Sequence, residues 1–180
     1  MILDLIRAVG ARLASLGTPP TLAGVTGPRP GDAVVYPWRR GKPGHVGLLS
    51  YVPGVDLPDP LPVVEARRWI GQGEYRLGAG GRRPEDGTPL DAEGRCDCSG
   101  FVCHCLGLDR KQIDGWINTT AIVRDAETPG GRFEAVGLAG VDLRRCRVIH
   151  CRGGKPPAVV ETDAGLWARR GGIVVRYVGG

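Results

Sequence analysis

The chain has 180 residues, a length that fits one domain with a substantial hydrophobic core. Hydrophobic residues make up 42% of it and charged residues 24%, which is ordinary for a globular protein and argues against a disordered chain. The net charge of +5 suits an anionic polymer or surface, but the basic residues are scattered and lack interleaved aromatic residues, so we expect no nucleic acid partner. No segment approaches the length of a membrane span.

The first expected element is an amphipathic helix at the N-terminus. Apolar residues recur at helical spacing in MILDLIRAVGARLASLG, while Asp4, Arg7 and Arg12 interrupt the apolar run that a signal peptide needs. Residues 1–23 are therefore interpreted as a helix and linker of a chain synthesised in the cytoplasm without a signal peptide. In that reducing compartment, six cysteines argue against a disulfide framework.

Short strands and helices are expected along the rest of the chain. GDAVVYPW and GHVGLLSYV predict two strands, and VVEARRWIG predicts a short helix that ends at Gly71. A helix is predicted to begin at Cys98, and Asn118 can cap another helix over TTAIVRDA. RCRVIHC, PAVVET and GIVVRYV predict further strands, so the pattern indicates an α+β domain.

The order of these segments is unusual. LAGV occurs at positions 22–25 and 138–141, and GVDL occurs at 54–57 and 140–143. If residues 24–53 are moved to follow Ala139, the new junctions again have the sequences LAGV and GVDL. This suggests a transposed two-strand block of natural or engineered origin. Short repeats in a chain rich in Gly, Ala and Val also arise by chance, and this alternative stays open.

The segment RCDCSGFVCHC holds four of the six cysteines: Cys96, Cys98, Cys103 and Cys105. Zinc sites usually use pairs two to four residues apart with a long gap between the pairs, and a helix from residue 98 would point these thiols in different directions, so we expect no metal and no cofactor. Cys98 alone stands at a predicted helix N-terminus, where the macrodipole and free N–H groups lower a thiol's pKa and can hold an oxyanion. These features make Cys98 the candidate nucleophile.

A cysteine nucleophile needs a base and a group that orients it. His45 and His150 each lie at the end of a predicted strand, whereas His104 lies within the Cys98 helix and points away. With the block returned to follow Ala139, only residues 46–53 and 140–149 separate His45 from His150, which fits two neighbouring antiparallel strands. A lone histidine is more often structural, but beside DCSG we favour a catalytic role for both.

These segments together resemble the NlpC-type cell-wall cysteine peptidases, a papain-like superfamily that also includes the CHAP amidases. The resemblance covers most of residues 64–180 together with 28–52, through WIGQGEYRLGAGG, CDCSGFV, PGDAVVYP, GHVGLL, VIHCRGG and GLWARRGGIVVRY. It implies one papain-like α+β domain over residues 1–180, with a central antiparallel sheet packed against helices. The strand order is rearranged, because the block 24–53 that carries His45 precedes the nucleophile helix and C-terminal strands of residues 64–180.

The resemblance also implies a Cys–His–His triad in which Cys98 attacks, His45 is the base and His150 orients His45. Permuted relatives sometimes use Glu as the third member, which makes Glu65 the alternative if VVEA forms a strand. We favour a helix there, which makes Glu65 a solvated residue.

The substrate-binding residues implied by the resemblance are Tyr75, in the pocket on the oxyanion side, and Asp97 and Ser99, which match positions that recognise a free amine of the peptide stem. The expected activity is hydrolysis of an amide bond in a peptidoglycan stem peptide, with a muropeptide as partner. Delivery by a phage or a secretion system would bring the protein to the periplasm or cell wall. The alternatives are a permuted-type acyltransferase or thioesterase with the same Cys–His dyad, and an inert wall-binding domain whose rearranged order has separated the triad.

Overall fold

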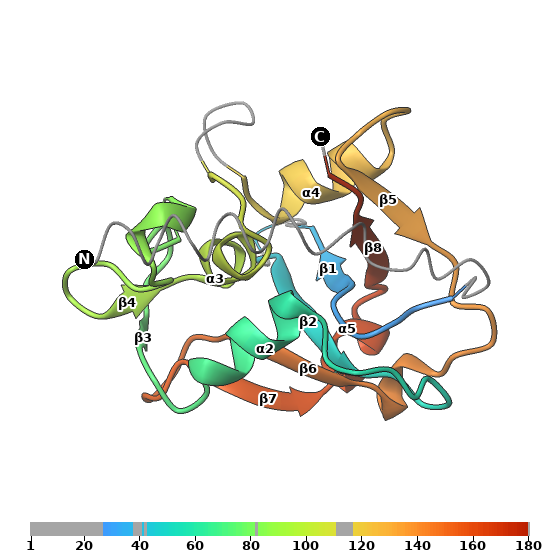
Figure 1. Ribbon diagram of the computed structural model, residues 1–180, viewed down its shortest axis with the longest axis horizontal. Coiled ribbons are helices and arrows are strands. Elements are labelled where there is room, and N and C mark those ends of the chain that lie inside the picture. The colour runs from blue at the N-terminus through green and yellow to red at the C-terminus, as the bar shows by residue number, and fades with distance from the viewer. Residues whose placement is uncertain (1–26, 38–40, 42, 82, 111–116, 180) are drawn as a thin grey trace, which may run out of the picture.

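The protein is a mixed α+β structure built around a six-stranded antiparallel sheet (Figure 1). The computed structural model describes residues 27–37, 41, 43–81, 83–110 and 117–179, so the helix expected in residues 1–23 lies outside the described residues. The strands lie in the order β5-β8-β1-β2-β6-β7, and every neighbouring pair is antiparallel. The six strands are β1 (Ala33–Tyr36), β2 (His45–Tyr51), β5 (Phe133–Val136), β6 (Arg147–Cys151), β7 (Val159–Asp163) and β8 (Ile173–Tyr177).

The helices are short and surround this sheet. The α-helices are α2 (Leu61–Arg68), α3 (Cys98–Cys105), α4 (Thr119–Ala126) and α5 (Gly165–Arg169), with the 3-10 turns η1 (Pro84–Asp86) and η2 (Leu143–Arg145). Two further strands, β3 (Glu74–Tyr75) and β4 (Arg95–Cys96), pair in parallel in a small separate sheet. No helix in the described residues is long and apolar enough to cross a bilayer.

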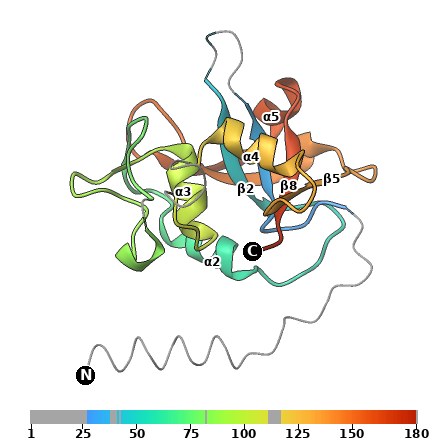
Figure 2. The ribbon, with the colours of Figure 1, turned by 90° about the horizontal axis from the view of Figure 1, so that it is seen from above.

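Apolar side chains cover both faces of the sheet. One face, which includes Val35, packs against α2, α3 and α4, with Phe101 of α3 fully buried in the contact. The other face, which includes Val34, packs against α5 through Trp167. Successive strand residues point to opposite faces, so a strand covered on both sides has a continuous apolar run such as AVV. The helices α2 and α3 lie side by side over the first face (Figure 1, Figure 2).

Most elements expected from the sequence are present. The predicted strands correspond to β1, β2, β6, β7 and β8, and the predicted helices to α2, α3 and α4. Asn118 caps α4, since its side-chain oxygen accepts from the N–H groups of Thr120 and Ala121 at 3.0 Å. The two-residue strands β3 and β4 were not predicted, and neither were β5 and α5. In β5 only Phe133 is buried, and the five residues of α5 have no side-chain N-cap, so neither segment has a strong local signal.

The block of residues 24–53 contributes the two central strands of the sheet. β1 pairs with β8, and β2 pairs with β6, so this hairpin lies between strands from the C-terminal third of the chain. Arg176 of β8 reinforces the contact, because its Nε and one terminal nitrogen each donate to an Asp32 carboxylate oxygen at 2.8 Å. A Cβ atom added to Gly27 would lie 3.2 Å from the Ala139 Cβ atom. Gly27, which lies near the start of the block, is therefore close in space to Ala139, the residue after which the transposition hypothesis places the block.

Candidate active site

Cys98 is the first residue of α3, and Asp97 caps that helix by accepting from the Gly100 N–H at 2.7 Å. The thiol is 4% exposed. The backbone N–H groups of Val46 and Ser99 lie close enough to its sulfur to lower its pKa. Burial has a larger effect, and together with the Asp97 charge it raises the pKa of Cys98 to about 12. The expectation of a lowered pKa was therefore wrong, because burial outweighs the helix terminus, and the resting group is a neutral thiol.

His45 and His150 form a hydrogen-bonded pair across β2 and β6. His45 Nε2 lies 2.8 Å from His150 Nδ1, and the two rings are nearly perpendicular, with centroids 4.9 Å apart. Gly47 makes room for this pair, since an added Cβ atom there would lie 2.9 Å from the His150 Cβ and would clash with the Val148 side chain. The antiparallel β2–β6 pairing thus brings together two histidines that are 105 residues apart in the chain.

The chain neighbours of His45 connect it to Cys98. Val46, whose N–H faces the Cys98 sulfur, directly follows His45 in β2. Tyr36, the ladder partner of His45 at the end of β1, also lies near Cys98, because a charge on that thiol contributes to raising the pKa of Tyr36. Cys98 and His45 therefore lie at the same end of the β1–β2 hairpin. The His45 Nδ1 atom makes no hydrogen bond within the described part of the chain.

Both histidines of the pair are held in the neutral form. Burial lowers the pKa of His45 to about 4, against an opposing effect of the Asp97 charge. Burial also lowers the pKa of His150 to about 3, with further lowering from His45 and Arg152. At neutral pH the site therefore holds a thiol and two neutral imidazoles, a set that can transfer protons without a change in net charge.

Trp167 of α5 holds the histidine pair from the second face of the sheet. Its ring stacks on His45 with centroids 5.3 Å apart and an interplanar angle of 23°, and meets the His150 ring edge-on at 4.9 Å. The side chain is fully buried, and its Nε1 has no hydrogen-bond partner in the part of the chain that the structure describes. Trp167 was not predicted as a site residue, although it lies in the segment GLWARRGGIVVRY, because its contact with the histidines depends on where α5 packs.

Asp97 and Ser99, proposed from the sequence to bind a substrate amine, are both buried and bonded to Arg110. One terminal nitrogen of Arg110 donates to Asp97 Oδ2 at 2.7 Å and to Ser99 Oγ at 2.9 Å. Asp97 Oδ2 also accepts from the Gly78 N–H at 2.7 Å. In this structure a cation from the chain itself occupies the position expected for an amine. Arg110 was not predicted as a partner of Asp97, because no local sequence pattern separates it from the other arginines.

Tyr75, the proposed pocket residue, lies near Cys98. It ends β3, which pairs in parallel with β4 so that Tyr75 is the ladder partner of Cys96, two residues before Cys98. Burial raises the pKa of Tyr75, and the charges of Cys98 and Asp97 raise it further. A Cβ atom added to Gly153 would lie 3.5 Å from the Tyr75 ring, so the loop after β6 borders the same space.

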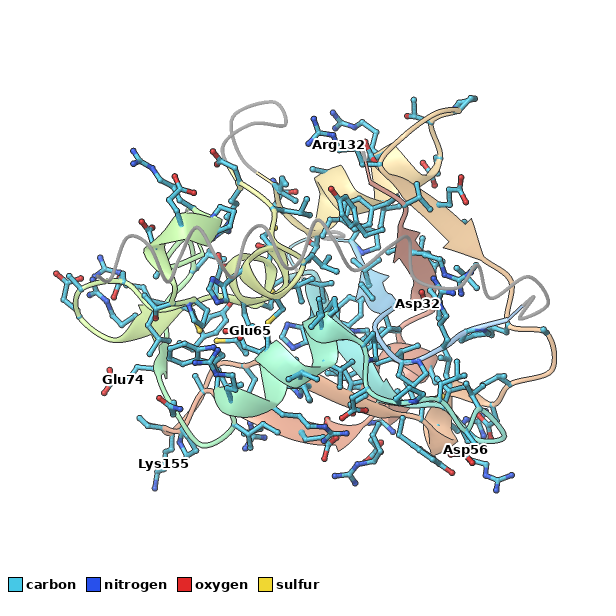
Figure 3. All side chains as sticks on the ribbon, in the orientation of Figure 1. Asp32, Asp56, Glu65, Glu74, Arg132 and Lys155 are labelled. Atoms are coloured by element: carbon cyan, nitrogen blue, oxygen red, sulfur yellow. The ribbon has the colours of Figure 1, made fainter. Side chains whose placement is uncertain are left out.

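Glu65, the alternative third triad member, lies on α2 where this helix meets α3 (Figure 3). Its Oε1 accepts from Trp69 Nε1 at 2.8 Å and lies 3.1 Å from His104 Nε2. Its Oε2 accepts from Arg68 at 2.8 Å. The helix expected over VVEA is present, but Glu65 is a bonded residue between two helices and not a freely solvated one. It is bonded to His104 and not to the His45–His150 pair.

The other five cysteines are buried and reduced. Cys96 and Cys151 lie with their sulfurs 2.8 Å apart, so β4 and the end of β6 are in contact just before α3. Burial raises the pKa of Cys103 to about 12 and that of Cys146 to about 11. Within the described ranges, no group of three or more His, Cys, Asp or Glu side chains is arranged to hold a metal ion.

A cysteine at a helix N-terminus thus faces the backbone N–H of Val46, the residue after His45, and His45 is hydrogen-bonded to His150. Cysteine and histidine side chains are the groups that nucleophilic acyl chemistry uses. Comparison of the chain with protein families, with curated proteins and with solved structures finds no match. Any function assigned to this chain therefore has to follow from its own residues and their geometry.

Proposed function

We propose that this chain is a papain-like cysteine hydrolase of the NlpC type, which cleaves an amide bond in peptidoglycan stem peptides. The observation that carries the proposal is the 2.8 Å hydrogen bond between His45 and His150, at the strand end where the Val46 N–H faces the sulfur of a cysteine at a helix N-terminus. A base held by a second side chain beside a cysteine is the set that thiol hydrolases require. The motif resemblance supplies the substrate class.

The proposed reaction begins with the neutral thiol. The Cys98 sulfur attacks the amide carbonyl while the His45 Nδ1 takes the thiol proton, since burial keeps both groups neutral at rest. The N–H groups at the start of α3 that do not bond to Asp97, including that of Ser99, are available to the oxyanion. The tetrahedral intermediate expels the amine, which takes the proton from His45, and a thioester to Cys98 remains. Water then attacks the thioester with His45 as base, giving a carboxylate and the free thiol.

Two neighbours support the charged state of His45 during this reaction. The imidazolium that forms when His45 takes the proton lies against the face of Trp167, where cation–π attraction contributes roughly 0.5–2 kcal/mol. Asp97 is negatively charged and raises the pKa of His45. Both effects favour the transition state over the neutral resting state.

The substrate pocket differs from the one that the motif alone would predict. A stem-peptide amine would have to displace Arg110 from Asp97, which would leave a buried charge without its partner. We therefore assign Asp97 and Ser99 to the support of the α3 N-terminus, and Tyr75 and the Gly153 loop to the substrate-binding wall. Delivery to the cell wall by a phage or a secretion system stays part of the proposal.

Cleavage of purified muropeptides by the wild type and by the Cys98→Ala variant tests the proposal. The wild type should release a new amine and a new carboxylate, detected by mass spectrometry, and Cys98→Ala should release neither. Cys103→Ala is the matched control, because Cys103 is buried on the same helix but five residues after its first residue, Cys98. Cleavage of thioesters or lipid esters without cleavage of muropeptides would instead identify the acyltransferase or thioesterase alternative. Activity retained in Cys98→Ala would refute the mechanism.

Alkylation by iodoacetamide tests whether Cys98 is a neutral thiol or a thiolate in the resting protein. Because its pKa is raised to about 12, Cys98 should react slowly at pH 6 in the folded protein. In urea all six thiols should react at similar rates, which supplies the control. Fast and selective modification of Cys98 at pH 6 would show a preformed thiolate and would contradict attack from the neutral thiol.

A further inference from the structure

A third polar side chain continues the line of His45 and His150 across the sheet. Thr162 lies on β7, the strand next to β6, and its Oγ1 is 3.1 Å from His150 Nε2. The three side chains come from three adjacent strands, β2, β6 and β7, and form a continuous chain of hydrogen bonds. Thr162 is not a member of the Cys98–His45–His150 triad, and no sequence motif pointed to it.

The hydrogen bond between Thr162 and Asp163, at the end of this series, determines the direction of the two bonds before it. Thr162 Oγ1 donates to the backbone carbonyl of Asp163 at 3.1 Å. A carbonyl can only accept, and a hydroxyl has a single hydrogen, so that hydrogen is committed to Asp163. Thr162 Oγ1 must then accept from His150, which requires a proton on His150 Nε2.

The same reasoning continues to His45. A neutral imidazole has one N–H, so a proton on His150 Nε2 leaves Nδ1 as an acceptor. His150 Nδ1 therefore accepts from His45, which requires a proton on His45 Nε2. In a neutral His45 the remaining nitrogen, Nδ1, then has its lone pair free. That atom is the one without a hydrogen bond in the described part of the chain.

We propose that Thr162 is a positioning residue that fixes the tautomers of His150 and His45, so that the unprotonated Nδ1 of His45 is available as the base. The catalytic consequence depends on the function proposed above, whereas the tautomer assignment stands without it. Without the Thr162 oxygen, His150 loses the acceptor that selects its Nε2–H form, and His45 can carry its proton on Nδ1, where it cannot accept the thiol proton.

The direct test is nuclear magnetic resonance of the full chain labelled with ¹⁵N in its histidine rings. Two-bond ¹H–¹⁵N correlation at neutral pH distinguishes protonated from unprotonated ring nitrogens. His45 and His150 should both be Nε2–H tautomers in the wild type, and Thr162→Val, which keeps the shape and removes the hydroxyl, should give mixtures. A wild type with Nδ1–H on either histidine, or Thr162→Val spectra with unchanged tautomers, would overturn the proposal.

Activity supplies the second readout. Thr162→Val should lower kcat by about tenfold to a hundredfold, the range typical of a lost outer hydrogen bond, with little change in KM. Thr162→Ser keeps the hydroxyl and should restore both kcat and the wild-type tautomers. Thr128→Val is the matched control, because the Thr128 hydroxyl also donates to a carbonyl, that of Arg124, at the end of α4.

The results separate failure of the positioning role from failure of the proposed function. If the wild type has the expected tautomers and Thr162→Val disturbs them, but no muropeptide is cleaved, the hydrolase proposal fails and the positioning role stands. If muropeptides are cleaved and Thr162→Val matches Thr128→Val in kcat, the positioning role is overturned. The wild-type spectrum and Thr162→Ser provide a decision even if Thr162→Val does not fold.

Discussion

The Arg110 guanidinium donates to the Asp97 carboxylate at 2.7 Å, and the two side chains are only 1% and 2% exposed. Arg110 also donates to three backbone carbonyls, those of Ala79, Gly80 and Ile117, at 3.0 to 3.3 Å. A buried ion pair with its remaining donors satisfied in this way is costly to break from one side only. Through Arg110, Asp97, the residue before Cys98, is connected to the loop at Ala79 and Gly80 and to Ile117, which follows α3 in the chain.

Replacing Arg110 with Met should therefore destabilise the protein by about 3–5 kcal/mol, because Asp97 would remain as a buried charge without its partner. Urea denaturation followed by circular dichroism measures this free energy of unfolding. Arg144→Met is the matched control, since the Arg144 side chain is 75% exposed and should change stability by less than about 0.5 kcal/mol. Equal effects of the two substitutions would contradict a structural role of the Arg110–Asp97 pair.

The hydrogen-bonded pair of half-buried His45 and buried His150 predicts a loss of stability in acid. The pKa of His45 is lowered to about 4 and that of His150 to about 3, while an unfolded histidine titrates near 6.5. Below pH 6.5 the unfolded chain thus binds protons that the folded protein does not. The free energy of unfolding therefore has its full value, with respect to these two groups, above about pH 6.5 and falls as the pH drops toward 4.

Urea denaturation at several values between pH 7 and pH 5 measures this slope. A double variant, His45→Gln with His150→Gln, should have a flatter dependence, because the two groups that gain protons on unfolding are gone. The difference between the slopes isolates the histidines from carboxylates that titrate in the same range. The same slope in the wild type and the variant would mean that the pair titrates normally.

The contact between Cys96 and Cys151 predicts a disulfide under oxidising conditions. Their sulfurs are 2.8 Å apart and both thiols are buried, so little movement is needed for a bond. Refolding with oxidised glutathione should convert the two thiols to one disulfide and release two molecules of reduced glutathione. The closed loop joins residues 55 apart, which should stabilise the fold by roughly 2–4 kcal/mol.

Peptide mapping by mass spectrometry identifies the bridge, and Cys96→Ser should abolish it. Cys103→Ser removes a buried thiol that is not part of the contact, and should leave the bridge intact. A bridge between other cysteines, or six free thiols after refolding, would contradict this prediction.

The position of the β1–β2 hairpin leads to a prediction about chain order. Gly27 lies next to Ala139, and Val55 and Val141, which follow the two repeated glycines, pack against the same apolar cluster. A variant with residues 24–53 inserted after Ala139 should therefore fold to the same sheet. It should fold faster, since the β2–β6 pairing becomes local and its loop-closure entropy smaller.

Thermal melting by circular dichroism and stopped-flow refolding of both chain orders test this. We expect one cooperative melting transition for each chain order, and faster refolding of the chain in which residues 24–53 follow Ala139. A cooperative transition in only one of the two orders would contradict the prediction, because the contacts between the block and its neighbouring strands would then depend on the chain connection.

The sequence alone determined the local elements of this protein. The apolar runs of β1, β2 and β6, the Asn118 cap of α4 and the start of α3 at Cys98 were all predicted, because the information lies in a few adjacent residues. The antiparallel pairing of β2 with β6 was foreseen only as a consequence of the transposition hypothesis, and the rest of the strand order was not predicted. The short β5 and α5 were missed, because each forms through contact with the sheet and not through local propensity.

Tertiary structure alone decided the chemistry of the site. The sequence favoured a lowered pKa for Cys98 from its helix position, but burial, which depends on the whole fold, reverses the direction. Arg110, Trp167 and Thr162 come from three separate segments and meet the predicted residues only after the strands pair and the helices pack. Charge, ring stacking and hydrogen-bond direction act over a few ångströms in space, whatever the distance along the chain, so they could not be read from the order of residues.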